Sequence, residues 1–163
     1  MRKSRKLVII IICSILLACL SVGLWQCVKY YVLPPDQEMA TQLYEYDKAD
    51  FRLIIDYFVA SEDTKIFINK ASYDNDDMNV AGHKIEDKQV LQALKRCFAI
   101  KGYKAIGRNG NTIYFEKWSF GERSRGLAYL IKADADLWID ALVESVPLSQ
   151  NHWYYYETDY GEF

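Results

Sequence analysis

One polar stretch of the chain carries oxygen-bearing side chains at a spacing that could bind calcium. Asn75, Asp77, Asn79 and Glu86 fall on positions 1, 3, 5 and 12 of an EF-hand loop, whose carboxylate and amide oxygens are the ligands that Ca²⁺ prefers. An EF-hand normally has Asp at position 1 and Gly at position 6, whereas this chain has Asn75 and Val80 there. No helix is predicted to lead into the stretch. We therefore predict a solvated acidic loop and no metal ligands.

The residue types that act as nucleophiles or bind zinc are not spaced for catalysis. His83 and His152 have no partner at the H-x-x-x-H or C-x-x-C spacing of zinc sites. Ser119, Ser124 and Ser145 lack the strand-to-helix context of a nucleophile elbow. The 22 carboxylates always offer some pair for sugar hydrolysis, but no pair stands out. The sequence predicts no catalytic residue and no cofactor, so we expect the protein not to be an enzyme.

The densest aromatic cluster lies near the C-terminus, at Trp153, Tyr154, Tyr155 and Tyr156. In a strand, Trp153 and Tyr155 share one face while Tyr154 and Tyr156 share the other. We expect one face to complete the core. The other face is either covered by the tail 159–163 or a helix, or left exposed as an aromatic pair. An exposed pair could contact sugar or a protein partner, so these four residues form the predicted binding surface.

Secondary structure must position these residues, and hydrophobic periodicity predicts it. Apolar residues three and four apart indicate helices over 36–60 and 87–99, and a short helix within 133–143. Strands are expected at 65–69, 103–106, 112–118, 126–132, 143–148 and 152–157. Asn109-Gly110 favours a type I′ turn, and the segment from Ser119 to Arg125, which contains Gly121, is read as a hairpin loop.

Short turns between the strands predict an antiparallel meander packed against two or three helices, which is an α+β fold. In the strand 112–118, Ile113 and Phe115 should point one way, with Tyr114 and Trp118 on the other face.

The first 33 residues form a predicted transmembrane anchor. Residues 7–28 are an apolar run without a charge, about 33 Å long as a helix, close to the ~30 Å hydrocarbon core of a bilayer. Four basic residues precede the run and Lys29 alone follows it. The positive-inside rule then keeps the N-terminus in the cytoplasm and places residues 34–163 outside the plasma membrane, as one extracytoplasmic domain.

The N-terminal segment has two alternative interpretations. A cleaved secretory signal fits the basic start, but the apolar run is too long and no A-x-A-like site follows. Leu16-Leu-Ala-Cys19 resembles the lipobox of bacterial lipoproteins, in which the Cys is lipidated. Here Cys19 is followed by further apolar residues and not by the usual polar tether. An uncleaved anchor is therefore the prediction, with lipidation of Cys19 as the alternative.

Charge and cysteine content narrow the class of the outer domain. Residues 36–163 carry 15 Lys and Arg against 22 Asp and Glu, a net charge of −7, which argues against nucleic acid as a partner. Cys13, Cys19 and Cys27 lie in the anchor, so Cys97 has no partner for a disulfide within the domain. The domain must rely on its own hydrophobic core. Cys97 lies on the apolar stripe of a predicted helix, where a small buried side chain is expected.

The C-terminal 40 residues resemble the ending of small, membrane-anchored or lipoprotein-like extracytoplasmic proteins of Gram-positive bacteria. The matching motifs are Gly126-Leu-Ala-Tyr129, Pro147-Leu-Ser149, Trp153-Tyr-Tyr-Tyr156 and Asp159-Tyr160. The resemblance implies an exported α+β domain and carries over no activity. We expect a single-pass interaction module, a subunit or modulator of an envelope complex. The alternatives are a lipid-anchored binder of an envelope glycan or peptide, and an envelope hydrolase.

Overall fold

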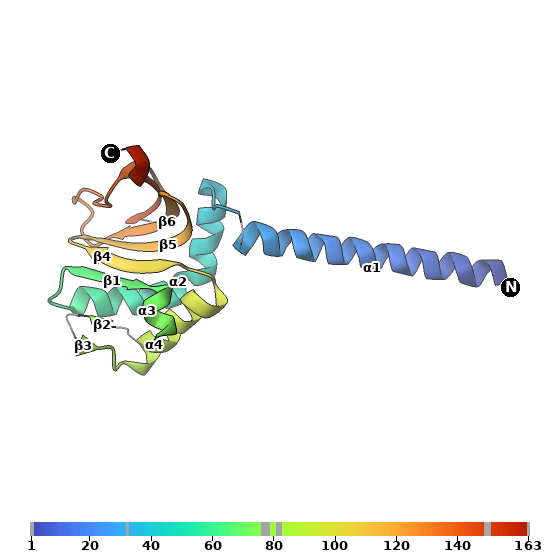
Figure 1. Cartoon of the computed structure of the whole chain (residues 1–163), viewed down its shortest axis with the longest axis horizontal. Coiled ribbons are helices and arrows are strands. Elements are labelled where there is room, and N and C mark those ends of the chain that lie inside the picture. Colours follow the sequence, from blue (N-terminus) through green and yellow to red (C-terminus); the bar gives the residue numbers. More distant parts are fainter. Residues whose placement is uncertain (1, 32, 76–78, 81–82, 149–150, 163) are drawn as a thin grey trace. The chain divides into compact units, whose positions relative to one another are not determined.

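The computed structural model describes residues 2–31, 33–75, 79–80, 83–148 and 151–162. The chain divides into two compact units, Met1–Leu33 and Pro34–Phe163. The first unit contains helix α1 (Arg2–Tyr31), which continues without a break through Cys19 (Figure 1). Its segment Ile11–Lys29 is long and apolar enough to cross a membrane, and a signal sequence near an N-terminus meets the same criterion.

The second unit is an α+β domain, as predicted. Its helical elements are α2 (Gln37–Ala60), α3 (Lys70–Asp74), α4 (Lys88–Lys95), the π-turn η1 (Arg96–Ile100) and the 3₁₀ turn η2 (Tyr160–Glu162). Its strands are β1 (Lys65–Asn69), β2 (Asn79–Val80), β3 (His83–Lys84), β4 (Ala105–Asn109), β5 (Thr112–Phe120), β6 (Arg123–Leu130), β7 (Leu142–Pro147) and β8 (Trp153–Asp159).

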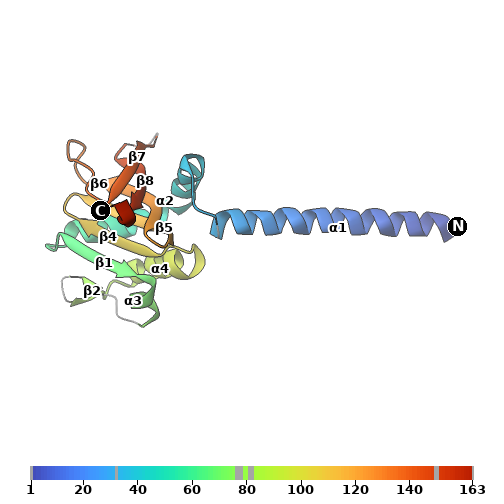
Figure 2. The same ribbon diagram turned by 45° about the horizontal axis from the view of Figure 1, so that its top comes forward.

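Six strands form one antiparallel sheet in the order β1-β4-β5-β6-β8-β7. The strands β4, β5 and β6 are the predicted meander. After β6 the chain passes over the position of its neighbour, forms β7 at the edge, and returns with β8 between β6 and β7, as Figure 2 shows at that end of the sheet. The last strand of the chain is therefore an inner strand, which explains why its aromatic residues are mostly buried.

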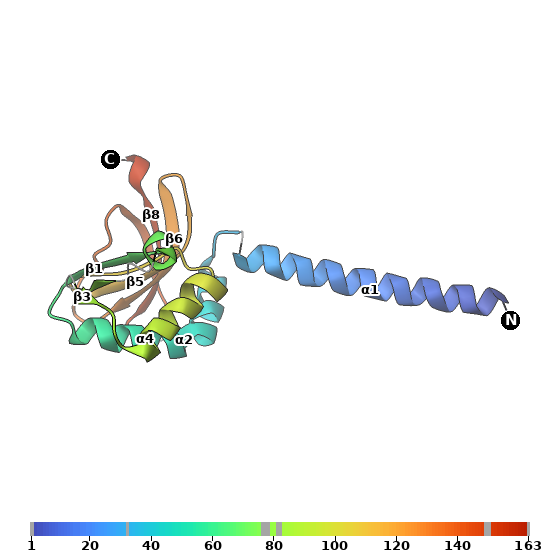
Figure 3. The ribbon, with the colours of Figure 1, turned by 60° about the horizontal axis from the view of Figure 1, so that its bottom comes forward.

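Helices α2 and α4 lie side by side on one face of the sheet (Figure 3). Each begins at a carboxylate cap: Asp36 accepts from the backbone N–H of Met39, and Asp87 accepts from those of Gln89 and Val90. The apolar stripes of these helices pack on the inward residues of β4, β5, β6 and β8. Phe51 of α2 illustrates the packing, because its ring contacts those of three neighbouring aromatic residues in this core, Tyr103, Phe115 and Trp153.

In the tight hairpins β4–β5 and β5–β6, the strands pair in a register that makes the turn differ from the predicted one. In the β4–β5 hairpin, Asn109 pairs with Thr112, so the central residues are Gly110 and Asn111 and not Asn109 and Gly110. Only Gly110 has positive φ there, which fits a II′-type turn with Gly first and not the predicted type I′. In the β5–β6 hairpin, Phe120 pairs with Arg123, so the strands extend well into the predicted loop and turn at Gly121.

Two segments between the strands also differ from expectation. Residues 131–141 form turns and not a short helix, and the backbone N–H of Trp138 donates to Thr112 Oγ1 at 2.9 Å. Conversely, the short helix α3, capped by Asn69, ends at Asp74 directly before the calcium-like spacing, so the prediction that no helix leads into that stretch is wrong. Asp77 of the calcium-like spacing lies outside the described residues, so that spacing stays untested.

Candidate functional site

Within the described part of the outer domain, one face of the sheet is covered by no long helix (Figure 3). Strand alternation and the register place Tyr114 and Glu116 of β5, Gly126 of β6 and Tyr156 of β8 on this helix-free face. The residues between them, such as Phe115 and Tyr155, point toward α2 and α4. A polar and aromatic group therefore gathers at the centre of the helix-free face.

A hollow of about 260 Å³ opens on this face. The segment 131–141 passes over the sheet and forms one wall, and η2 forms another. Exposed aromatic rings stand among the lining residues, and Trp138 is 65 % exposed. The lining consists of Lys65, Ile66, Phe67, Arg108, Asn109, Tyr114, Glu116, Ser124, Trp138, Ile139, Asp140, Tyr156 and Tyr160. We call this space the open-face hollow.

Tyr114 forms part of the floor of the open-face hollow because β4 has a glycine opposite it. Gly107 pairs with Tyr114, and a Cβ at Gly107 would clash with the Tyr114 ring and come within 2.6 Å of the Ile66 carbonyl oxygen. The glycine thus lets the phenol ring lie against the backbone of β4. Burial and the charges of Glu116 and Asp140 raise the pKa of Tyr114, so its hydroxyl stays protonated and can donate a hydrogen bond at neutral pH.

Glu116 places a partly buried carboxylate in the same hollow. Burial raises its pKa, while the hydroxyls of Ser119 and Ser124 and the charge of Lys104 favour the ionised form. Ser124 is itself held by a 2.7 Å hydrogen bond to Thr158. A carboxylate in this position can accept hydrogen bonds from a ligand.

The carboxylates outnumber the available cations around the hollow. An adjoining hollow shares Lys65, Asn109, Trp138 and Asp140 with the first one. It adds Asp134 and Asp136, so four carboxylates line the combined space. Two cationic residues line it, Lys65 and Arg108.

Arg108 is committed elsewhere. Its guanidinium donates to the carbonyl oxygens of Phe58, Ser61 and Asp63 at and after the end of α2, and of Gly110 in the hairpin. The combined space is therefore acidic, with aromatic walls.

The four aromatic residues of the predicted binding surface, which all belong to β8, do not form an exposed pair in the structure. Trp153 and Tyr155 are buried on the helix side, which matches the prediction that one face of this strand completes the core. On the other face, Tyr156 is 1 % exposed and Tyr154 is half-buried, so an exposed aromatic pair is not found there. Because β8 is an inner strand, residues of β6 and β7 flank Tyr156 on the helix-free face. Tyr156 alone of the four lines the open-face hollow.

The histidines and the cysteine of the outer domain that the sequence singled out lie outside the open-face hollow or outside the described side chains. His152 lies before β8 with positive φ, and its Nδ1 is 2.8 Å from the Leu130 carbonyl oxygen. Cys97 is buried, and burial raises the pKa of its thiol, which opposes formation of a reactive thiolate. The side chain of His83 lies outside the described part of the chain. Among the described residues, no three His, Cys, Asp or Glu side chains gather as metal ligands.

A buried ionic cluster on the helix side is a second concentration of charge. Lys101 Nζ lies 2.8 Å from Asp47 Oδ1 and 2.7 Å from Asp50 Oδ2. The Tyr103 hydroxyl donates to Asp47 at 2.6 Å, and Arg96 Nε donates to Asp50 at 2.9 Å. Burial raises the pKa of Asp50, but hydrogen bonds from Arg96 and Lys101 outweigh it and leave the pKa low. The cluster joins α2 to the end of η1, so we interpret it as structural.

Of the residues that line the open-face hollow, sequence reasoning singled out Ser124, as a serine without the context of a nucleophile, and Tyr156, in the terminal aromatic cluster. Alternation in the strand 112–118 placed Tyr114 away from the core, which was the available signal. Trp138 and Asp140 come to the hollow from an irregular segment and Tyr160 from the short turn η2, and local sequence does not determine the paths of these segments. Comparisons of the chain with protein-family models, with curated proteins and with solved structures found no match.

Proposed function

We propose that this protein is a membrane-anchored, non-catalytic binding module, and that its outer domain binds a small amine-bearing ligand in the open-face hollow. The observation that carries the proposal is the combination of acidic and aromatic lining in one concave space. Glu116 and Asp140 line the hollow and Asp134 and Asp136 its extension, beside the exposed ring of Trp138. Carboxylates attract an ammonium group, and aromatic faces bind cations through their quadrupole.

The anchoring part of the proposal rests on α1. Its apolar segment fits a membrane anchor or a signal sequence, and we adopt the anchor. The excess of basic residues before the segment supports a cytoplasmic N-terminus and an extracytoplasmic domain at the plasma membrane. The resemblance to exported Gram-positive proteins supports the same location. A peptide of the cell envelope that carries lysine-like side chains is then the class of ligand that the hollow would meet.

A neutral glycan is the alternative ligand. Sugar hydroxyls also donate hydrogen bonds to carboxylates, and sugar rings stack on exposed aromatic side chains such as Trp138. We prefer the amine because four carboxylates line the combined space, while Lys65 is, among the described lining residues, the one cation that is not already bonded to backbone carbonyls, as Arg108 is. A bound ammonium group would offset this excess of negative charge, whereas a neutral sugar would not. An envelope hydrolase is the third candidate, since Glu116 is a carboxylate with a raised pKa in a cleft.

A second function, as a subunit or modulator of an envelope complex, is favoured by the edge strand β7. Val143 on this strand is 57 % exposed, and the outer edge of β7 pairs with no other described strand. An added strand from a partner protein could pair there. Cross-linking of the full chain in native membranes, followed by mass spectrometry, tests this function: one recurrent stoichiometric partner supports it, and recovery of the protein alone opposes it.

The binding proposal is tested by calorimetric titration of the full chain in lipid nanodiscs. The ligands are a short lysine-containing peptide, the same peptide with acetylated lysines, and a chitin-type oligosaccharide. We expect binding of the free amine and loss of binding on acetylation, because acetylation removes the charge. Equal binding of both peptides contradicts the proposed recognition, and binding of the oligosaccharide alone supports the glycan alternative.

Variants locate the binding site in the same experiment. Glu116→Gln keeps the shape of the side chain and removes its charge, so it is expected to weaken binding at least tenfold, about 1.4 kcal/mol. The control is Asp56→Asn, because Asp56 is an exposed carboxylate of α2 on the opposite side of the sheet. Equal affinities of wild type and both variants would place the amine site elsewhere.

A further inference from the structure

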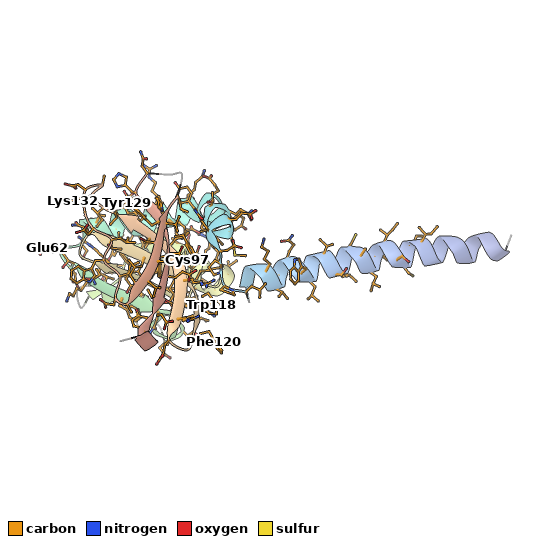
Figure 4. All side chains as sticks on the ribbon, turned by 90° about the horizontal axis from the view of Figure 1, so that it is seen from above. Glu62, Cys97, Trp118, Phe120, Tyr129 and Lys132 are labelled. Carbon is orange, nitrogen blue, oxygen red and sulfur yellow. The ribbon has the colours of Figure 1, made fainter. Side chains whose placement is uncertain are left out.

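The tip of the β5–β6 hairpin presents two aromatic side chains outside the open-face hollow. Phe120 is 78 % exposed, and its ring centroid is 6.4 Å from that of Trp118. Figure 4 labels both residues on one side of the domain and Tyr129 and Lys132 on another. Trp118 was predicted to share a face with Tyr114. A β-bulge at Lys117 changes this, because it pairs Trp118 with Arg125 on the opposite face of the sheet.

A chain of side-chain contacts links this tip to the start of the domain. Arg125 lies over the Trp118 ring, with its guanidinium carbon 5.9 Å from the ring centroid. Arg125 Nε is 3.1 Å from Glu157 Oε1, and the same carboxylate accepts a hydrogen bond from Tyr155. The Tyr155 hydroxyl also lies 3.2 Å from the carbonyl oxygen of Pro35. All of these contacts lie within the outer domain.

Pro35 is the point at which the chain enters the domain from the N-terminal segment. It immediately precedes Asp36, the cap of α2, so the domain begins there without a linker. Pro35 is two residue steps from Leu33, the last residue of the N-terminal unit, a span of at most about 7 Å. If α1 crosses a bilayer, the surface of that bilayer lies close to Pro35. The contacts described above then bring Trp118 to the same region.

We propose that Trp118 and Phe120 lie in the interfacial layer of the bilayer that holds the chain's own anchor. This proposal rests on the proposed membrane anchoring. Tryptophan favours the membrane–water interface because its large ring is apolar and its N–H is polar, and phenylalanine adds apolar area. A second, short contact of this kind would fix the orientation of the domain on the membrane.

The charges around the tip are consistent with zwitterionic lipid. Arg123 pairs with Asp159 at 2.7 Å, and Arg125 pairs with Glu157. The basic side chains beside the aromatic rings are thus already matched by carboxylates of β8. We expect the contact to depend on apolar insertion, and to change little when anionic lipid replaces zwitterionic lipid.

The other end of β5 offers an internal control. Trp138 is bonded through its backbone to Thr112, and Thr112 is six residues from Trp118 along the strand, about 20 Å. Trp138 is an exposed tryptophan, but it lines the open-face hollow and does not lie at the hairpin tip. The proposal therefore expects Trp118 in lipid and Trp138 in water.

The test is fluorescence quenching by brominated lipids, with the full chain in nanodiscs of zwitterionic lipid. The chain has four tryptophans: Trp25 in the anchor segment, Trp118, Trp138 and the buried Trp153. Trp25→Phe removes the anchor signal. In this background, brominated lipid is expected to quench part of the remaining emission. Adding Trp118→Phe is expected to abolish that quenched part, whereas adding Trp138→Phe is expected to leave it.

Each outcome separates the proposal from the anchoring on which it depends. Quenching in wild type but none in Trp25→Phe leaves the anchor intact and overturns the contact at Trp118. No quenching in wild type overturns membrane anchoring and the contact together. Quenching that is lost with Trp138→Phe instead of Trp118→Phe also overturns the contact, because it places the other end of the sheet in lipid.

A second variant keeps the test valid if Trp118→Phe disturbs the fold. Phe120→Glu changes a highly exposed side chain at the turn, so the core is expected to stay intact. It is expected to reduce the quenching of Trp118, since a carboxylate is costly in the interface. Val143→Glu is the matched control, because Val143 is similarly exposed but lies on β7. Equal quenching in Phe120→Glu and Val143→Glu overturns the role of the hairpin tip.

Discussion

Lys117 is a buried lysine, and its ionisation is expected to make the stability of the outer domain rise with pH. The residue is 5 % exposed, and burial lowers its pKa from 10.5 to about 8, although the nearby carboxylate of Asp47 opposes the shift. The folded protein therefore binds this proton more weakly than the unfolded chain. Stability is lowest where both states are protonated, below about pH 8, and increases from there toward pH 10.5.

The size of the effect follows from the two pKa values. A pKa that falls from 10.5 to about 8 on folding corresponds to about 3 kcal/mol over the whole window. Between pH 7 and pH 9.5, the linkage relation gives a gain of about 2 kcal/mol in the free energy of unfolding from this residue alone.

Lys117→Met removes the titration while it retains a side chain of similar length. The variant loses the hydrogen bond from Lys117 to the Lys101 carbonyl, so its stability at a single pH does not isolate the ionisation. The pH dependence of the stability difference between the two proteins isolates the ionisation of Lys117, because Cys97 and the buried tyrosines titrate in both proteins. Urea unfolding of the full chain in mild detergent, followed by near-ultraviolet circular dichroism, measures it.

We expect the stability of wild type minus that of Lys117→Met to increase by about 2 kcal/mol from pH 7 to pH 9.5. Lys104→Met is the matched control, because Lys104 is an exposed lysine, and it should keep the wild-type pH dependence. A difference between wild type and Lys117→Met that stays constant over this range would refute the assigned burial of a charged lysine.

Three further substitutions test the packing of the domain. Lys101→Met leaves the buried Asp47 and Asp50 without their shared cation and is expected to cost about 3 kcal/mol in urea unfolding; a cost below ~1 kcal/mol would contradict the ion cluster. Asp36→Ala removes the cap of α2 and is expected to cost about 1 kcal/mol, with faster hydrogen exchange in the first turn of that helix as the specific sign. Gly126→Ala brings a methyl group against the backbone of β5 and is expected to cost about 3 kcal/mol, seen as a lower melting temperature; an unchanged melting temperature would contradict the close approach of the two strands.

The elements with strong local signals could be predicted from the sequence. The strand Lys65–Asn69 has its predicted limits, and α2 and α4 each begin one residue after the predicted start, at Gln37 and Lys88. In each case a short-range pattern sufficed, either apolar periodicity or a carboxylate that bonds to nearby N–H groups. The buried Cys97 follows from the same helical periodicity.

The order of the strands could not be predicted in the same way. A meander places each strand beside its predecessor, whereas β8 lies between β6 and β7. This arrangement depends on packing over the whole sheet, and it buries Tyr156, for which the sequence had left a covered and an exposed position open. The bulge at Lys117 is a smaller case, since one additional residue moves Trp118 to the other face of the sheet.

The candidate site depends on the parts of the chain that sequence patterns describe least. Glu116 belongs to a well-predicted strand, but Trp138 and Asp140 reach it from a segment without regular structure. A short helix was predicted there, and a backbone hydrogen bond from Trp138 to Thr112 accompanies a different path. Contacts between residues that are distant in sequence therefore create the hollow, and no local sequence pattern predicts it.

The position of the bound ligand on the outer domain distinguishes the open-face hollow from every other surface of the domain. We would record amide spectra of the ¹⁵N-labelled full chain in nanodiscs while adding the lysine-containing peptide. We expect shifts concentrated at Glu116, Ser124 and Asp140 and at the indole N–H of Trp138, with the residues of α2 unchanged. Shifts on the outer surface of α2, or none at saturating peptide, would contradict the assignment of the open-face hollow as the binding site.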